Sequence, residues 1–153
     1  MKKAVLSLEL ATKMFKGNDP ELRAFAVENY PDLGKDIKDR INDFSDILSL
    51  NNMSQLDFEN RCENKCPHEI GALKEELIVS AYNEGVKPDY SDGTIKYCPI
   101  FNHSGGFSFY VLDGWNSVSG VGSRRDFCGP NALANLRDAV TKFLPEYKES
   151  RTL

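Results

Sequence analysis

The sequence lacks several features that would assign it to a well-defined class of protein. No apolar run approaches the roughly 20 residues of a membrane-spanning helix, so we expect no membrane partner and a cytoplasmic location. It has no internal repeat and no low-complexity tract. Its lysines and arginines are not clustered, and the formal net charge is −4. Because phosphate groups are bound by clustered basic side chains, nucleic acid is disfavoured as a partner.

The chain also lacks a recognisable catalytic constellation, and it contains only two histidines. His103 and Ser104 could pair as base and nucleophile, but a glycine-rich hairpin turn accounts for both, and no orienting group is evident. Gly120 and Gly122 lack the third glycine of a dinucleotide-binding fingerprint, and Arg125 stands in its place. We therefore predict that the protein is not an enzyme and holds no cofactor.

The four cysteines are expected to be reduced in a cytoplasmic protein. The only cluster that resembles a metal site is Cys62-x3-Cys66-x-His68. Zinc sites usually combine two close pairs of ligands, and the remaining candidates, which include Cys98 and Cys128, have no such spacing. We predict no metal, and zinc bound by this cluster is the alternative.

Helices are indicated at both ends of the chain by capping residues and by apolar residues spaced three and four apart. Ser7 and Asp19 are predicted N-caps of two short helices, which end near Gly17 and Pro31. Further helices are predicted within residues 35–50, 67–84 and 130–144, and the tail after Pro145 is expected to fray. The resulting organisation is an N-terminal helical region (1–50), a linker or loop (51–66) and a module (67–145).

The pattern between residues 95 and 127 predicts three short β-strands, because side chains of alternating character recur there between glycine-rich turns. The two longer helices would cover one face of this sheet. We therefore predict an α+β fold with short N-terminal helices, followed by a helix, a three-stranded antiparallel sheet and a closing helix. Its core is expected to bury five side chains: Leu77, Phe107, Phe109, Leu136 and Val140.

Four motifs in and before this stretch resemble a recurring pattern. They are E-G-V-K-P-D, I-K-Y-C-P-I-F, G-G-F-S-F-Y and G-V-G-S-R-R-D-F. They resemble an uncharacterised family of small proteins from phages, prophages and mobile elements of gut bacteria, with the pattern N-E-G-x-x-P-D, K-Y-x-P-x-F, G-F-S and V-G-S-R-x-x-F. The matching residues are Asn83, Glu84, Gly85, Pro88, Asp89, Lys96, Tyr97, Pro99, Phe101, Gly106, Phe107, Val121, Gly122, Ser123, Arg124 and Phe127.

This resemblance implies a biological setting, the cytoplasm of a bacterial host, and no mechanism. The N-terminal residues 9–31 also resemble the lead-in helices of such proteins, whereas the middle of the chain has no match. Two departures stand out. Arg125 occupies a position where the family has an apolar residue, and Cys128, Gly129 and Pro130 replace a helix start with lysine and serine or threonine.

Exposed aromatic side chains beside arginine are typical of binding surfaces. We predict such a surface where the turn at residues 113–116 meets the third strand, formed by Trp115, Arg124, Arg125, Tyr97 and Tyr110. For the arginines themselves, a pair with a carboxylate that supports the fold is the favoured interpretation, and the binding contact is the alternative. The favoured function is a non-enzymatic accessory protein of a phage or mobile element that binds a protein, such as a host factor or a defence component. The alternative function is binding of a nucleotide or single-stranded nucleic acid on the aromatic and arginine face.

Overall fold

A computed structural model of the chain describes residues 5–91, 93–102, 108–111 and 125–151. The predictions made for Phe107, Trp115 and Arg124, and for the side chains of Phe109 and Tyr110, lie outside this description. The chain divides into two compact units, Met1–Arg40 (unit 1) and Ile41–Leu153 (unit 2). The stretch 51–66, predicted as a linker, lies within unit 2 and contains a helix.

Unit 1 is a helical hairpin followed by two short helical turns. Its elements are α1 (Leu8–Lys16), α2 (Pro20–Asn29), the 3-10 helix η1 (Pro31–Gly34) and α3 (Ile37–Arg40). Both predicted N-caps are confirmed: the Ser7 hydroxyl accepts the N–H of Leu10 at 3.2 Å, and the Asp19 carboxylate accepts the N–H of Glu21 at 2.9 Å. Each cap satisfies an N–H that has no partner within the helix, which fixes where the two helices begin.

The core of unit 1 is small. Among the described residues of unit 1, Ala11, Ala26 and Leu33 form a buried cluster in which two of the three are alanines, and Ile37 of α3 is buried as well. Partly buried apolar side chains surround them, namely Leu6, Met14, Phe15, Val27 and Tyr30. The Tyr30 hydroxyl donates a hydrogen bond of 2.6 Å to the carbonyl of Leu6, which ties the segment before α1 to the end of α2.

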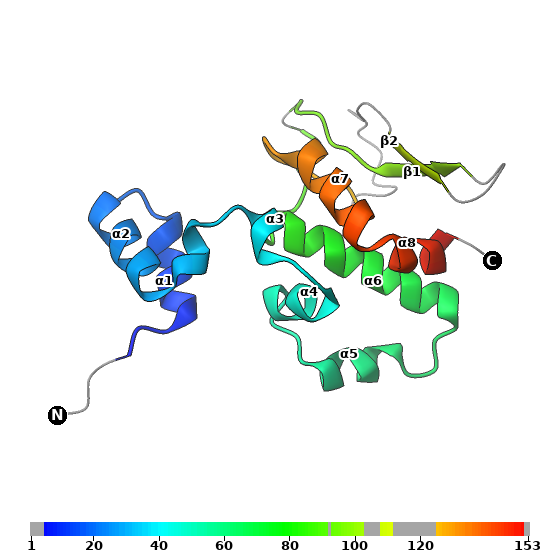
Figure 1. The fold of residues 1–153 in the computed structure, drawn as a ribbon, viewed down its shortest axis with the longest axis horizontal. Helices are drawn as coiled ribbons and strands as arrows, with labels where there is room; N and C mark the ends of the chain where they lie inside the picture. Colours follow the sequence, from blue (N-terminus) through cyan, green and yellow to red (C-terminus); the bar gives the residue numbers. More distant parts are fainter. Residues whose placement is uncertain (1–4, 92, 103–107, 112–124, 152–153) are drawn as a thin grey trace. The chain divides into compact units, whose positions relative to one another are not determined.

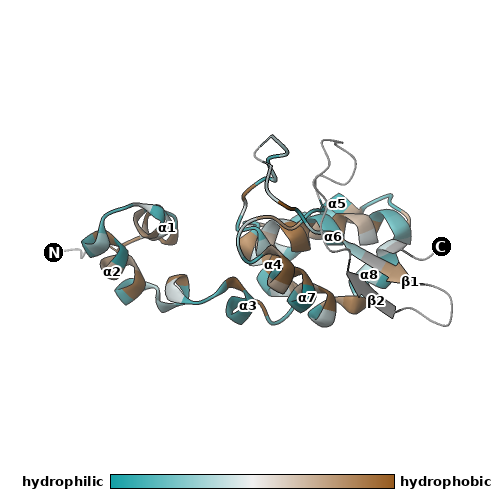
Figure 2. Ribbon diagram, turned by 90° about the horizontal axis from the view of Figure 1, so that it is seen from above, coloured by the Kyte–Doolittle hydropathy of each residue, from teal (hydrophilic) through white to brown (hydrophobic). Residues whose placement is uncertain are grey.

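Unit 2 is built around its longest helix. Its helices are α4 (Phe44–Leu50), α5 (Gln55–Cys62), α6 (Pro67–Tyr82), α7 (Ala132–Lys142) and α8 (Leu144–Arg151). Helix α6 contacts α4, α7 and α8, as Figure 1 shows. Ile78 and Val79 of α6 and Leu136 and Val140 of α7 are buried. Figure 2 shows hydrophobic segments on these helices where they lie side by side.

Capping boxes explain two differences from the predicted helices. The helix predicted within 35–50 is divided, because the side chains of Asp43 and Asp46 form a capping box that starts α4. In the same way, Ser54 and Asp57 form a capping box that starts α5, which was not predicted. The tail predicted to fray is helical up to Arg151, since proline is tolerated in the first turn of a helix.

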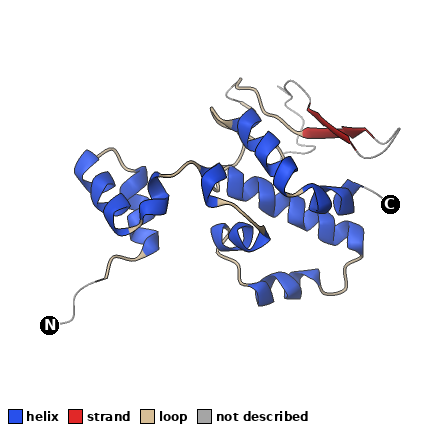
Figure 3. Ribbon diagram, in the orientation of Figure 1, coloured by secondary structure: helices blue, strands red, loops and turns tan. Residues whose placement is uncertain are grey.

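The prediction of an α+β fold with a three-stranded sheet is wrong. The described residues are mainly helical, and their strands are β1 (Pro99–Asn102) and β2 (Ser108–Val111), which pair antiparallel with Phe101 opposite Phe109 (Figure 3). Within the described part of the predicted third strand, Phe127 forms an isolated bridge with Tyr97. Residues 95–101, expected to form the first strand, therefore pair with two different segments: Tyr97 with Phe127, and Phe101 with Phe109.

The predicted core is confirmed where it is described. Leu77 is 7% exposed, Leu136 0% and Val140 2%. Tyr147, beyond the predicted module, is fully buried and its ring lies 5.5 Å from that of Phe101. No helix among the described residues is both long and apolar enough to span a membrane.

Candidate functional site

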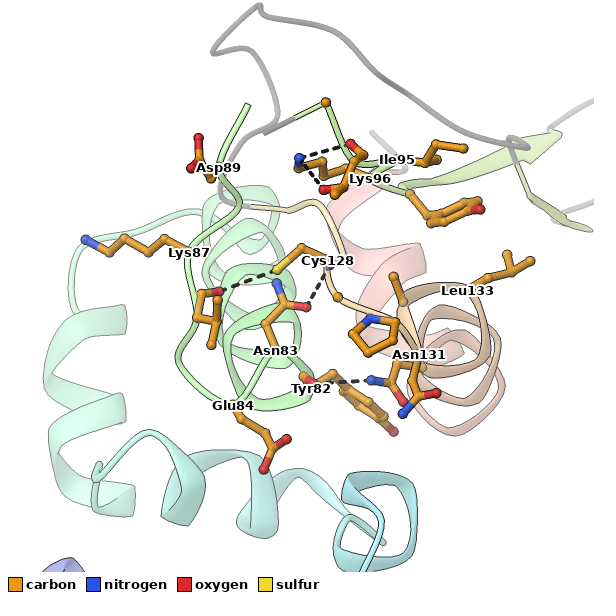
Figure 4. A pocket seen from close by; sticks show the side chains of 18 residues that line it. Tyr82, Asn83, Glu84, Lys87, Asp89, Ile95, Lys96, Cys128, Asn131 and Leu133 are labelled. Carbon is orange, nitrogen blue, oxygen red and sulfur yellow. Dashed lines mark hydrogen bonds between the residues drawn. The ribbon is translucent and has the colours of Figure 1, made fainter. Parts of the chain in front are cut away.

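An open groove of about 980 Å³ lies in unit 2 where the end of α6, the segment after it and the start of α7 meet. Figure 4 shows Cys128 and Asn83 between Lys96 on one side and Tyr82 on the other. The walls of the groove come from residues 82–97 and 128–135. The site is therefore assembled from two chain segments that are more than thirty residues apart in the sequence.

The end of α6 forms the first wall. Gly85 adopts a positive φ of 76°, a conformation that glycine tolerates without steric cost, and its N–H donates to the carbonyl of Ser80 at 2.9 Å. This closes the helix and turns the chain into the segment that carries Val86 and Ile95. Val86 is 61% exposed and Ile95 is 50% exposed, so the groove presents two large aliphatic side chains to solvent.

The side chain of Asn83 joins the two walls. Its Nδ2 donates to the carbonyl of Asp126 at 2.9 Å, and its Oδ1 accepts the N–H of Cys128 at 3.1 Å. The bridge between Tyr97 and Phe127, with N–H···O distances of 3.0 and 2.8 Å, adds a second connection. These bonds hold the segment before α7 against the end of α6 and give the groove a fixed floor.

The start of α7 offers polar groups to the groove. Asn131, at the N-cap position, makes no capping hydrogen bond with its side chain. The Nδ2 of Asn135, a residue that is 5% exposed, lies 3.4 Å from the carbonyl of Tyr82, and its Oδ1 accepts no hydrogen bond from the described residues. Unpaired buried acceptors are uncommon in folded proteins, and this oxygen is itself shielded from solvent.

A buried polar cluster adjoins the groove. The Lys96 ammonium, in a residue that is 1% exposed, donates to the carbonyl of Thr94 at 3.0 Å and to its hydroxyl at 2.8 Å. It also lies 5.6 Å from the centre of the Tyr90 ring, a cation–π distance. The Tyr90 hydroxyl donates a hydrogen bond to Asp126.

The electrostatics of this cluster follow from burial. Burial raises the pKa of the Asp126 carboxyl, because a charged carboxylate is poorly solvated there, and the hydrogen bond from Tyr90 acts in the opposite direction. Burial, followed by the hydrogen bond to Asp126, also raises the pKa of the Tyr90 hydroxyl. Both groups therefore resist ionisation more than they would in water, as expected for a structural layer beneath a groove.

The binding residues predicted from the sequence are placed unevenly. Tyr97 lines the groove and is half-buried. Arg125 is not among the residues that line it. Its Nη1 is 3.9 Å from the Oε2 of Glu75, a fully buried carboxylate that also accepts the Ser150 hydroxyl at 2.8 Å. The backbone of Tyr110 lies in β2 opposite Ile100. Trp115 and Arg124 lie outside the described residues.

The absence of a bound metal stays a prediction. Within the described residues, no group of three or more histidine, cysteine, aspartate or glutamate side chains could hold an ion. Cys66 is the N-cap of α6, where its N–H donates to Glu69 at 2.8 Å.

Sequence reasoning missed most of the groove. It gave no binding role to Val86, Ile95 or Asn135, and it treated Lys96 as a strand residue. The available signal was the motif N-E-G-x-x-P-D at residues 83–89, which contains the amide that joins the two walls.

No protein-family model, curated protein or solved structure matches the chain. The resemblance to phage and mobile-element proteins stays a prediction.

Proposed function

We propose that the protein acts by binding another protein, and that the groove takes an extended segment of that partner. The observation that carries this proposal is the exposure of Val86 and Ile95 on the lining of the groove. Large apolar side chains left in water cost free energy that a partner side chain would recover on binding. An aliphatic or aromatic residue of the partner would pack against these side chains.

The polar rim supports a peptide over a uniformly charged polymer. Glu84 and Asp89 line the groove together with Lys87, so both signs of charge are present at its exposed rim. A peptide backbone carries both donors and acceptors, and the first turn of α7 offers backbone N–H groups, since the N-cap side chain of Asn131 makes no capping hydrogen bond. A nucleic acid would place its phosphates against these two carboxylates as well as the Lys87 ammonium group.

The setting of this proposal comes from the sequence resemblance. In a phage or mobile-element protein, the partner would be a host factor or a component of host defence. The alternative, a nucleotide or single-stranded nucleic acid, needs an available arginine beside an aromatic surface. The Nη1 of Arg125 lies 3.9 Å from the buried carboxylate of Glu75, so the positive charge of this arginine is paired within the fold.

The test is a selection of peptides from a random displayed library on the full chain, followed by measurement of Kd by fluorescence anisotropy. We expect the selected peptides to bind Ile95→Asp at least about tenfold more weakly, a loss of about 1.4 kcal/mol. The matched control is Leu56→Asp, because Leu56 is also exposed, at 64%, but lies in α5 and does not line the groove.

Two results would overturn the proposal. One is a selection that yields no binder, and the other is a set of peptides that bind both variants equally well. A parallel titration with a fluorescent oligothymidine between about 50 and 200 mM salt tests the alternative, since binding to phosphates weakens steeply over this range. Circular dichroism of each variant checks that the fold is retained.

A further inference from the structure

We propose that unit 1 is a self-association module: the hairpin α1–α2 pairs with the same hairpin of a second copy of the chain. The motivating observation is a concentration of exposed apolar side chains at the N-terminus. Of the eight large apolar residues that stand exposed among the described residues, five lie before η1: Val5, Leu8, Leu10, Leu22 and Phe25. Figure 2 shows hydrophobic segments on both helices of this hairpin.

The hairpin buries too little by itself. Its helices bury only Ala11 and Ala26 among the described residues, and the rest of unit 1 adds Leu33 and Ile37. A unit of about 40 residues usually needs metals, disulfides or oligomerisation to be stable. All four cysteines lie in unit 2, so no disulfide can supply the difference in unit 1. A two-helix hairpin packs only one stripe of each helix against the other, and pairing two hairpins into a four-helix bundle buries a second stripe.

The exposed area fits what a dimer needs. The five side chains are between 45% and 87% exposed, and a large side chain that is about half exposed offers roughly 100 Å². Two copies therefore offer roughly 1,000 Å² of apolar surface. A standard interface buries about 1,600 Å², of which about 65% is apolar in homodimers, or roughly 1,000 Å².

The charges of unit 1 also favour a second copy as the occupant. The unit carries eight basic and seven acidic residues, whereas the rest of the chain carries 11 basic and 16 acidic residues. Its charges pair locally, as in Lys13–Glu9 at 3.1 Å and Lys35–Asp32 at 2.8 Å. Two identical surfaces that are nearly neutral and internally paired meet without net repulsion, which a self-complementary two-fold interface requires.

Leu22 and Phe25 of α2 are the residues whose substitution tests this interface. Leu22 and Phe25 are three apart on this helix, so they project from neighbouring positions of one face. They are 45% and 48% exposed, and neither belongs to the buried centre of the unit. Substituting both with aspartate would therefore disrupt an interface between copies without removing a core side chain.

The experiment is sedimentation velocity of the full chain from about 1 to 200 µM. We expect a concentration-dependent dimer of a 17.2 kDa chain, and a dimer dissociation constant at least about a hundredfold higher for the double variant Leu22→Asp/Phe25→Asp. Leu56→Asp in α5 is the matched control and should dimerise like the unmodified chain. A second measurement replaces Phe25 with a photoreactive phenylalanine and maps the crosslink by mass spectrometry, so that the result does not depend on how the aspartate variant folds.

A dimer that the double variant weakens, with a crosslink from position 25 to α1 or α2 of a second copy, supports the proposal. A chain that is monomeric over the whole range overturns it, as does a crosslink from position 25 into unit 2 of the same chain. A dimer that the double variant leaves intact also overturns it, because the contact must then lie elsewhere.

Discussion

Substituting Gly71 with alanine tests how closely α8 docks on α6. A Cβ atom at this position would lie 2.5 Å from the backbone nitrogen of Ser150 and 2.7 Å from its Cα. These are backbone atoms of α8, so no rotation of a side chain can relieve the contact. Helix α8 would have to move away from α6, and the buried hydrogen bond between Ser150 and Glu75 would be strained with it.

The expected magnitude is a difference between two opposing terms. An alanine in the interior of a helix is more favourable than a glycine by roughly 0.5–1 kcal/mol. Overpacking of a tight contact typically costs about 1–3 kcal/mol, and a contact with backbone belongs at the upper end. The balance is a net loss of about 2 kcal/mol, which in a chain of this length lowers Tm by roughly 4–8 °C.

Urea denaturation followed by far-ultraviolet circular dichroism measures this loss in the free energy of unfolding. Ser150→Ala in the Gly71→Ala background should give no rescue, since it removes none of the clashing atoms. Gly17→Ala is the control, because a Cβ there would meet only the Met14 carbonyl at 3.4 Å and the Lys13 carbonyl at 3.7 Å. If Gly71→Ala stabilises the protein by about 1 kcal/mol, helix propensity alone acts at this site and the close approach of α8 is refuted.

Two further predictions concern the core of unit 2 and its buried carboxyl. Leu136→Ala removes a fully buried side chain of α7 and should cost about 2–5 kcal/mol in urea denaturation; a loss below about 0.5 kcal/mol, the value expected for Leu56→Ala, would mean that α7 is not docked. Asp126→Asn should gain stability relative to the unmodified chain as pH rises. A carboxyl whose pKa is raised by folding stabilises fully below its ordinary value of 3.8 and loses that contribution as pH rises through the raised value. A stability difference that stays constant between about pH 4 and 8 would contradict this.

Helix starts were predictable from the sequence where one side chain determines them. Ser7 and Asp19 accept N–H groups within their own first turns, so the caps are local and depend on no distant residue. The capping box at Ser54 and Asp57 is equally local. The sequence pattern does not indicate α5, because this helix buries only Phe58 and a single buried apolar residue gives no helical periodicity.

The strands could not be predicted in the same way, because their pairing is decided by distant residues. Tyr97 and Phe101 lie four residues apart in one predicted strand, yet Tyr97 pairs with Phe127 and Phe101 with Phe109. Alternation over seven residues specifies which side chains share a face and leaves the partner unspecified. The helices then determine the outcome, since Phe101 packs against Tyr147 of α8, a residue of the tail that was expected to fray.

The candidate groove shows the same division between local and distant information. The sequence indicates that α6 ends near Gly85, because glycine at a helix end has a local conformational reason. That this end becomes the wall of a groove depends on the side chain of Asn83, which binds the backbone of Asp126 and Cys128 more than forty residues away. An asparagine just after a helix is most simply explained as a cap, so its second role is visible only in the fold. The role of Val86 and Ile95 is likewise visible only in the fold. The two residues are nine positions apart in the sequence, and both line the groove.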